Sequence, residues 1–231
     1  MGLKNKKQSA DLFKENSLGK IKEIKNNPNF EIPLYQNGSS IGYLAPVKKS
    51  ALVVDILKEW RERNQYAFPT VFKVTLEGTE KWLEEQVMNR EDRILFMVKN
   101  KKESYVGHLG LSSFDYEDTS CEIDNVIRGK SETKGIMTSA HYGLTDWAFS
   151  NLDLRRLTLR VFSDNEKAVS LYSRCGFRKL KDIPLKKVKK DEENWAFEEI
   201  ENNDDAERYH SVMELISPYK SLEYFLTKEE N

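Results

Sequence analysis

The 231-residue chain has few residues that form disulfides or bind metals. It holds only two cysteines, Cys121 and Cys175, and three histidines, His108, His141 and His210. Two cysteines do not make a disulfide framework, and the histidines lack the short spacing of paired zinc ligands. The sequence therefore predicts a protein without disulfides and without a metal.

The chain also lacks a long apolar run and an excess of charge of either sign. Its apolar runs are far shorter than the roughly 20 residues that cross a bilayer as a helix, and its basic first residues are not followed by the apolar segment of a secretory signal. The 37 Lys and Arg offset 38 Asp and Glu, which leaves a formal net charge of −1. Because nucleic-acid-binding proteins carry basic surfaces, we expect a cytoplasmic protein with no nucleic-acid partner and no membrane partner.

The hydrophobic pattern that is present predicts an α/β protein with one mixed sheet covered by helices. The expected order is strand, helix, helix, three strands, helix, strand, helix and two strands. Extended runs at 30–35 and 41–47 flank Asn37-Gly38, a hairpin signal. Helices are expected at 51–64, around 82–87, at 135–151 and at 166–175, and strands at 93–98, 105–111, 121–127, 157–161, 177–188 and 209–216.

The expected domain covers residues 41–218, with an extension at each end. Residues 1–40 form an N-terminal extension that could include the start of the hairpin, and 219–231 form a C-terminal tail. The first 27 residues have a loosely helical spacing of apolar side chains, which suits either an arm for a homodimer or a solvated extension. The acid-rich stretch from Asp191 to Glu207 is predicted to be a solvated hairpin tip.

A polar loop from Arg128 to Gly135 connects an expected strand to an expected helix. Glycine permits a sharp turn, and the free N–H groups of a first helical turn attract anions. Lys130 and Lys134 add positive charge. This combination could hold a pyrophosphate, although many turns of this kind hold nothing.

The stretch that follows carries a more specific pattern. It matches N-x-x-A-x-x-L-Y-x-x-x-G-F at Asn165, Ala168, Leu171, Tyr172, Gly176 and Phe177. This pattern resembles the second signature of the GNAT (Gcn5-related) N-acetyltransferases. In the same register, residues 132–137 fall where that family has the (Q/R)-x-x-G-x-(G/A) pyrophosphate loop, with Gly135 kept but Glu132 and Met137 departing from the pattern. The resemblance, which extends from about Ile41 to Ile216, implies a central, mostly antiparallel sheet that splays at an acyl-CoA site and is flanked by helices.

The resemblance also implies the cofactor contacts. Acetyl-CoA, or another short acyl-CoA, would be the co-substrate. A backbone N–H near Val126 would polarise the thioester carbonyl, as a preorganised donor does. The predicted cofactor-binding residues are Asn125, Val126 and Ile127 for the pantetheine arm, Lys134, Gly135, Ile136, Met137 and Thr138 for the pyrophosphate, and Asn165.

The predicted catalytic residues are one acid and a choice of bases. Tyr172 stands where the family places its general acid, and a phenol is protonated at neutral pH and can donate to a thiolate. It could instead be a core aromatic. Glu122 and Asp124 share one face of their strand, and either could accept the amine proton; Glu122 could equally pair with a surface cation, and a bulge could turn both away. His108 is a third candidate, or a satisfied sheet residue.

The acceptor amine is the least determined part. Trp60, Arg61, Phe68 and His108 are the predicted acceptor contacts, and the segment around them resembles GNAT enzymes that acylate nucleotide-linked amino sugars. A hydrophobic plug is the alternative. Other hypotheses are a polyamine or protein N-terminal acetyltransferase, with carboxylates from Asp115, Glu117 and Asp118, and a non-catalytic acyl-CoA-binding module, against which the presence of Tyr172 and Asn165 argues.

Overall fold

The structure is a computed structural model that describes residues 3–218, so the expected tail at 219–231 lies outside the described residues. The chain forms two compact units, each assembled from separated segments. Unit 1 holds residues up to 47, 90–158 and those from 214 onward, and unit 2 holds 48–89 and 159–213. The α/β class with a mixed sheet is confirmed, and the domain bounds expected from the sequence, 41–218, stay a prediction.

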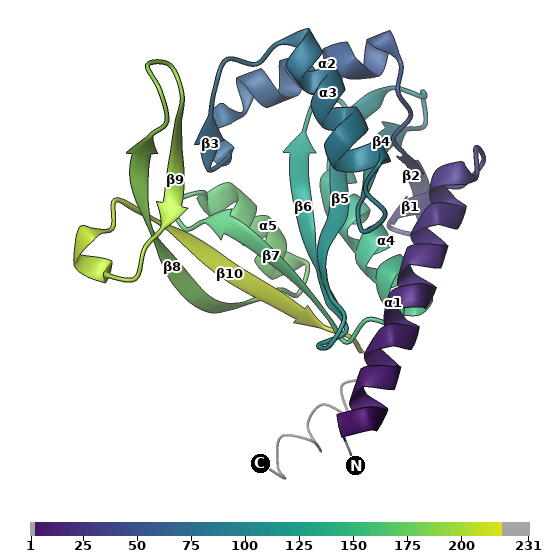
Figure 1. Cartoon of the computed structure of the whole chain (residues 1–231). Helices are drawn as coiled ribbons and strands as arrows, with labels where there is room; N and C mark the ends of the chain where they lie inside the picture. The colour runs from purple at the N-terminus through teal and green to yellow at the C-terminus, as the bar shows by residue number, and fades with distance from the viewer. Residues whose placement is uncertain (1–2, 219–231) are drawn as a thin grey trace. The chain divides into compact units, whose positions relative to one another are not determined.

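Unit 1 is a mostly antiparallel sheet with two helices (Figure 1). Its strands follow one another in the order β1-β2-β4-β5-β6, and β6 then pairs in parallel with the first three residues of β7. Its elements are α1 (Leu3–Asn26), β1 (Ile32–Gln36), β2 (Ser39–Pro46), β4 (Ile94–Asn100), β5 (Tyr105–Asp115), β6 (Ser120–Arg128), α4 (Ile136–Asn151), the start of β7 (Arg156–Phe162) and the end of β10 (Arg208–Ile216).

Unit 2 holds the rest of β7 and β10 together with β8, β9 and β3, in the order β7-β10-β8-β9-β3. Its elements are α2 (Ala51–Arg63), a 3₁₀ turn (Gln65–Ala67), β3 (Thr70–Val71), α3 (Leu76–Leu83), a π-helical turn (Glu84–Met88), α5 (Glu166–Arg174), β8 (Arg178–Lys189), β9 (Trp195–Glu199) and a 3₁₀ turn (Asn203–Asp205). The helix expected around 82–87 therefore begins earlier and ends as a π turn.

The hairpin between β1 and β2 is confirmed. Asn37 and Gly38 both have positive φ angles, 49° and 75°, as a two-residue turn of this kind requires. Leu34 is fully buried, and Ser139 Oγ on α4 donates to the carbonyl of Tyr35 at 2.8 Å. The first strand of this hairpin thus lies in the expected extension, as the sequence allowed, and both strands belong to unit 1.

The N-terminal segment is a helix, α1, with one buried stripe. Phe13, Ser17, Ile21 and Ile24 are buried at helical spacing, and Lys25 Nζ donates to the carbonyl of Arg90 at 2.6 Å. One face of α1 therefore packs within unit 1 rather than being wholly solvated. A role in dimer formation stays a prediction.

The acid-rich stretch expected as a hairpin tip contains a strand that composition does not reveal. Strand β9 pairs with β8 on one side and with β3 on the other, and Ala196 is buried. The first three residues of β9, Trp195 to Phe197, are apolar, and the two aromatic ones favour a strand within the acidic surroundings. The same pairing makes β3 out of residues expected to form a loop.

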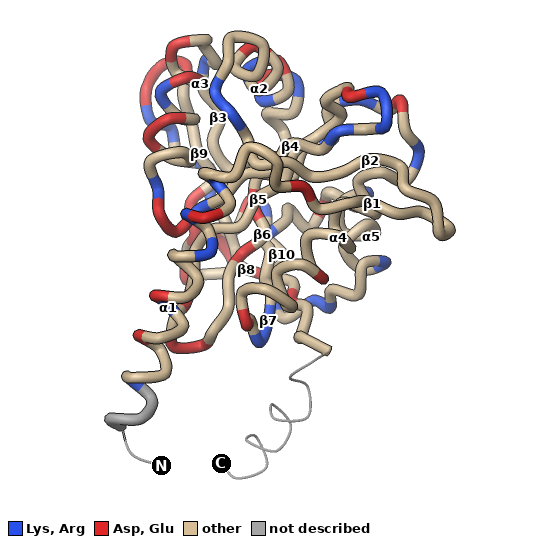
Figure 2. The backbone as a smooth tube through the Cα atoms, turned by 90° about the vertical axis from the view of Figure 1, so that its right-hand side faces the viewer, with Lys and Arg blue, Asp and Glu red and all other residues tan. Residues whose placement is uncertain are grey.

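Acidic and basic residues are interspersed along the chain of both units (Figure 2). Within residues 3–218, no helix is long and apolar enough to cross a membrane. In the same part of the chain, no group of three or more His, Cys, Asp or Glu is placed to hold a metal ion.

Candidate functional site

Strand β6 is interrupted by a bulge at the residues predicted to bind pantetheine. In the ladder with β5, His108 lies opposite Ile127 and Gly110 opposite Asp124, so Asn125 and Val126 together face a single residue. Asn125 has a φ of 47°, a conformation that asparagine tolerates better than most residues. A bulge of this kind re-aims the backbone and side chains of a strand.

Side chains from β5, from β6 and from the residue before β4 surround the bulge. The ring Nδ1 of His108 lies 2.6 Å from the carbonyl oxygen of Asn125. Asn125 Nδ2 donates to Asp124 Oδ2 at 2.9 Å, and the same carboxylate forms an ion pair with Arg93. Gly110 leaves room for Asp124, because a Cβ there would lie 3.1 Å from Asp124 Oδ1. The bulge is therefore held by a polar network.

The charges of this network bear on the choice of base. Burial lowers the pKa of His108 to about 4, although the carbonyl of Asn125 acts in the opposite direction. Burial raises the pKa of Asp124, against the effects of Arg93 and of hydrogen bonds. His108 is thus a weak base at neutral pH, and Asp124 is committed to Arg93. Glu122 shares the less buried face of β6 with Asp124, as the strand parity predicted.

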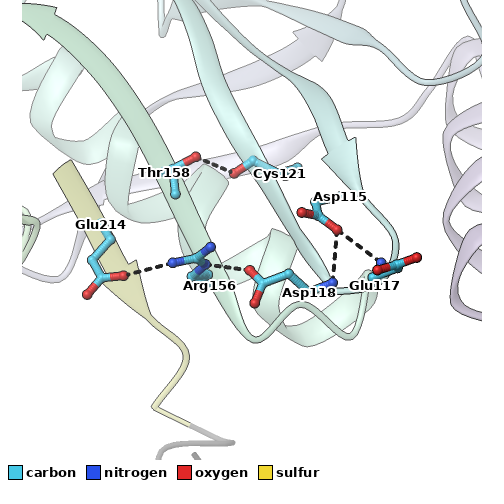
Figure 3. A network of polar contacts seen from close by, with 7 residues as sticks. All are labelled: Asp115, Glu117, Asp118, Cys121, Arg156, Thr158 and Glu214. Carbon is cyan, nitrogen blue, oxygen red and sulfur yellow. Dashed lines mark hydrogen bonds and ion pairs between the residues drawn. The ribbon is translucent and has the colours of Figure 1, made fainter. Parts of the chain in front are cut away.

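The opposite end of β6 is tied to β7 and β10 (Figure 3). The parallel pairing of β6 with β7 covers three residue pairs, the last of them Glu122 with Thr158. Thr158 Oγ1 donates to the carbonyl of Cys121 at 3.3 Å. Arg156 donates to Asp118 at 2.5 Å and to the buried carboxylate of Glu214 at 3.4 Å. These contacts fix the two strands at the end away from the bulge.

The turn between β5 and β6 holds the carboxylates considered for a polyamine site. Asp115 Oδ1 accepts the backbone N–H groups of Glu117 and Asp118, at 3.0 and 2.9 Å, and Asp118 pairs with Arg156 (Figure 3). Strands advance roughly 3.3 Å per residue, so this turn lies far along β6 from Asn125. Two of its three carboxylates serve the turn and the ion pair.

The loop before α4 ends in a glycine that the geometry requires. Gly135 has a φ of 82°, and a Cβ there would lie 2.5 Å from Nε2 of Gln36. No side chain caps this start of α4, and the first amides of a helix have no acceptor within it. The N–H of Ile136 donates to the carbonyl of Thr133 at 3.4 Å, so the backbone N–H groups of Met137 and Thr138 are the ones best suited to an anionic group.

Met137 departs from the family pattern, and the structure accommodates it. A Cβ on Gly107 would lie 2.6 Å from Met137 Sδ, so the thioether occupies the space over that glycine on β5. Met137 is buried. Its side chain packs on β5, and its backbone N–H still belongs to the first turn of α4. Glu132, the other departure, lies 3.7 Å from Lys130 in an exposed ion pair, and Lys134 is exposed.

In unit 2, helix α5 carries the predicted acid and its cap. Asn165 is the N-cap, its side chain accepting the backbone N–H of Ala168 at 3.3 Å. Tyr172 is buried, and its ring meets Phe177 edge-on with centroids 6.3 Å apart. Burial, with a smaller effect of Cys175, raises the pKa of Tyr172 well above its usual range. The hydroxyl is therefore fully protonated at neutral pH, as both a proton donor and a core aromatic would be.

The predicted acceptor contacts of unit 2 form a packed cluster. Trp60 is 1% exposed, so its side chain is part of the core on which α2 packs. The guanidinium of Arg61 lies over the rings of Phe68 and Phe72, at 4.1 and 4.8 Å, and donates to the carbonyl of Thr70 at 2.7 Å. Burial lowers the pKa of Arg61 to about 10. This arrangement fits the hydrophobic-plug alternative, and acceptor contact by these residues stays a prediction.

Sequence reasoning did not find Arg93, Gly110 or Gln36. In the sequence, Arg93 is an ordinary cation at the start of an apolar stretch, and Gly110 is one of two glycines in β5. Their importance follows from the register of β4, β5 and β6, which places them beside Asp124. Gln36 follows from the packing of the β1 end against the start of α4.

Comparison with known proteins identifies the family. The family model described as "Acetyltransferase (GNAT) domain" matches residues 44–178. The chain belongs to the GNAT acetyltransferase family. The expectation drawn from Asn165 to Phe177 is thereby confirmed.

Individual relatives are more distant. The chain is 30% identical over 82 residues to a spermidine N(1)-acetyltransferase of Vibrio cholerae; the match spans 36% of this chain and 47% of that protein, about half of its length. The solved structure of spermidine N-acetyltransferase from Vibrio cholerae in complex with CoA and spermine has a TM-score of 0.60 at 18% identity, covering 75% of this chain and 94% of that one. A dodecameric structure of spermidine N-acetyltransferase from the same organism has a TM-score of 0.56 at 17% identity, covering 77% and 96%. At these identities the structures establish the fold.

Proposed function

We propose that this protein is an acyl-CoA-dependent N-acyltransferase that uses acetyl-CoA, or another short acyl-CoA, to acylate a primary amine. The observation that carries the proposal is the arrangement in unit 1: the bulge of β6 at Asn125 and Val126, followed by a glycine-led helix start without a side-chain cap. The first can offer backbone groups to a pantetheine arm. The second can hold a pyrophosphate.

The chemistry follows from the groups assigned by the family resemblance. The amine nitrogen attacks the thioester carbon, and the N–H of Val126 stabilises the negative charge that develops on the carbonyl oxygen. The C–S bond then breaks, and the CoA thiolate takes a proton from the hydroxyl of Tyr172. The amine loses a proton to a base. The support for Tyr172 as the acid is its place in the family motif, because its protonated hydroxyl at neutral pH fits an acid and a core aromatic equally well.

Of the three candidate bases we favour Glu122 for its place on β6. It lies half-buried on β6, three residues before the bulge. Asp124 is paired with Arg93, and His108 is buried with a lowered pKa. Both are better suited to holding the bulge than to exchanging protons.

The acceptor class that the comparisons favour is a polyamine, because both the sequence relative and the structural neighbours are named as spermidine acetyltransferases. This favours the alternative over the amino sugar that the sequence resemblance suggested first. A nucleotide-linked amino sugar stays the second candidate, because two of the carboxylates in the turn before β6 are engaged locally.

A free-thiol assay with acetyl-CoA tests the proposal against a panel of polyamines, nucleotide-linked amino sugars and peptides. We expect thiol release that depends on one acceptor class, with spermidine or spermine as the first to try. Thiol release only with amino sugars would show that the acceptor is an amino sugar and not a polyamine, and the proposed acyl transfer would still stand. Measurable CoA binding with no release for any acceptor would instead support the non-catalytic CoA-binding module.

A further inference from the structure

The imidazole ring of His108 on β5 contacts the main chain of the bulge in β6. His108 is 3% exposed, and its Nδ1 is 2.6 Å from the carbonyl oxygen of Asn125. A carbonyl oxygen can only accept, so the ring must donate from Nδ1. Burial lowers the pKa of this histidine to about 4, so it holds the bond as a neutral ring at physiological pH.

The bond to the carbonyl of Asn125 also sets the direction of the next N–H. The carbonyl of Asn125 and the N–H of Val126 belong to one planar peptide unit, in which they point in opposite directions. Because His108 on β5 donates to the carbonyl of Asn125, this carbonyl points toward β5 and the N–H of Val126 points away from it. Because the ladder opposite these two residues is interrupted, the orientation of this peptide is not set by regular strand pairing.

A second contact holds Asn125 through its side chain. Asn125 Nδ2 donates to Asp124 Oδ2, and Asp124 is itself paired with Arg93. The positive φ of Asn125 is sparsely populated by residues other than glycine. Such a conformation persists where neighbouring groups hold it. Here the ring of His108 holds the carbonyl of Asn125, and the carboxylate of Asp124 holds its side chain.

We propose that His108 is a positioning residue for acyl transfer: by holding the carbonyl of Asn125, it aims the backbone N–H of Val126 at the thioester oxygen. This inference rests on the proposed function and replaces the roles of base and acceptor contact that the sequence suggested for His108. Asp124 and Arg93 act in the same network, by fixing the side chain of Asn125.

The test compares His108→Leu, which removes the donor, with His108→Asn, whose side-chain N–H can still reach toward the carbonyl. We expect His108→Leu to lower kcat for acetyl-CoA by about tenfold or more, as the loss of an oriented oxyanion donor does. The Kd of CoA, which has no thioester carbonyl, should change by less than about threefold. His108→Asn should recover part of kcat. The matched control is His141→Leu, another fully buried histidine of unit 1, which should leave kcat unchanged.

A spectroscopic readout makes the result independent of the acceptor. The infrared band of carbonyl-labelled acetyl-CoA should shift to lower frequency on binding to the unmodified protein, because a hydrogen bond weakens the C=O bond. That shift should be lost in His108→Leu and present in His141→Leu. An equal shift in both variants, or an unchanged kcat in His108→Leu, would overturn the inference. Absence of acetyl-CoA binding to the unmodified protein would instead refute the proposed function.

Discussion

At the scale of single residues, the environment of each side chain decides which chemistry it can perform. Tyr172 and His108 are both buried titratable groups, yet burial keeps the phenol protonated and the imidazole neutral. A protonated phenol can give a proton to a thiolate, whereas a neutral, hydrogen-bonded imidazole is better suited to hold a carbonyl. The two residues are therefore assigned different roles in the same proposed reaction.

The variant Tyr172→Phe tests the acid. It keeps the buried ring and removes the hydroxyl, so kcat should fall by about 10²-fold or more, as expected for a general acid. Binding of CoA, measured by calorimetry, should be nearly unaltered. The control is Tyr142→Phe, which changes a half-exposed tyrosine on α4. A kcat equal to that of the control would leave Tyr172 as a core aromatic.

At the scale of elements, the two helix starts carry different chemistry. The start of α4 has a glycine in a left-handed conformation and no side-chain cap, whereas the start of α5 is capped by Asn165. An uncapped start leaves its amides for a ligand, and a capped start uses one of them internally. Only the first is suited to hold a pyrophosphate on its backbone.

The variant Gly135→Ala tests the start of α4. Its Cβ would meet Gln36, and alanine at a φ of 82° is strained by roughly 1–2 kcal/mol. We expect lower stability in urea unfolding and weaker CoA binding. The double variant with Gln36→Ala should relieve the clash but not the backbone strain. Wild-type stability and CoA affinity in Gly135→Ala would contradict the requirement for glycine.

The variant Asn165→Ala tests the start of α5. Loss of the side-chain bond to the N–H of Ala168 should cost about 1 kcal/mol in the free energy of unfolding. Asn165→Asp keeps an acceptor and should retain most of that stability. An equal loss in both variants would show that the cap is not the cause. A separate fall in CoA affinity would support the predicted cofactor contact of Asn165.

At the scale of the whole molecule, buried histidines couple stability to pH. The pKa values of His108, His141 and His210 are all lowered from 6.5 to about 4, mainly by burial. Between these values the unfolded chain binds protons that the folded chain does not. The stability they contribute is thus present above pH 6.5 and is lost as the pH falls toward 4. Asp124, whose pKa is raised, acts in the opposite sense as a single group.

Urea unfolding as a function of pH measures this coupling. Below about pH 6.5, each of the three histidines should add up to about 1.4 kcal/mol of lost stability per pH unit. His141→Leu should make the slope shallower, whatever it does to the stability at neutral pH. A slope that stays the same in this variant would show that His141 is not among the groups responsible.

The features of this protein that depend on short sequence motifs could be predicted from the sequence. The motif from Asn165 to Phe177 indicated the family, and Asn37-Gly38 indicated the first hairpin; both are confirmed. Strand β9 was missed because acidic residues surround it and because one of its two partners, β3, is distant in sequence. Trp60 is buried and Arg61 lies over the ring of Phe68, while their predicted contact with an acceptor stays a prediction.

The sequence by itself determined the family, and through it the expected acyl-CoA donor, because motif residues with fixed spacing lie on single turns and helices. Only the tertiary structure shows what His108, Asp124 and Arg93 contact, and the roles proposed for them rest on those contacts. Their roles depend on the register of three strands and on a bulge that places a histidine ring against the carbonyl of Asn125. Register follows from packing over the whole sheet, and no short stretch of sequence specifies it.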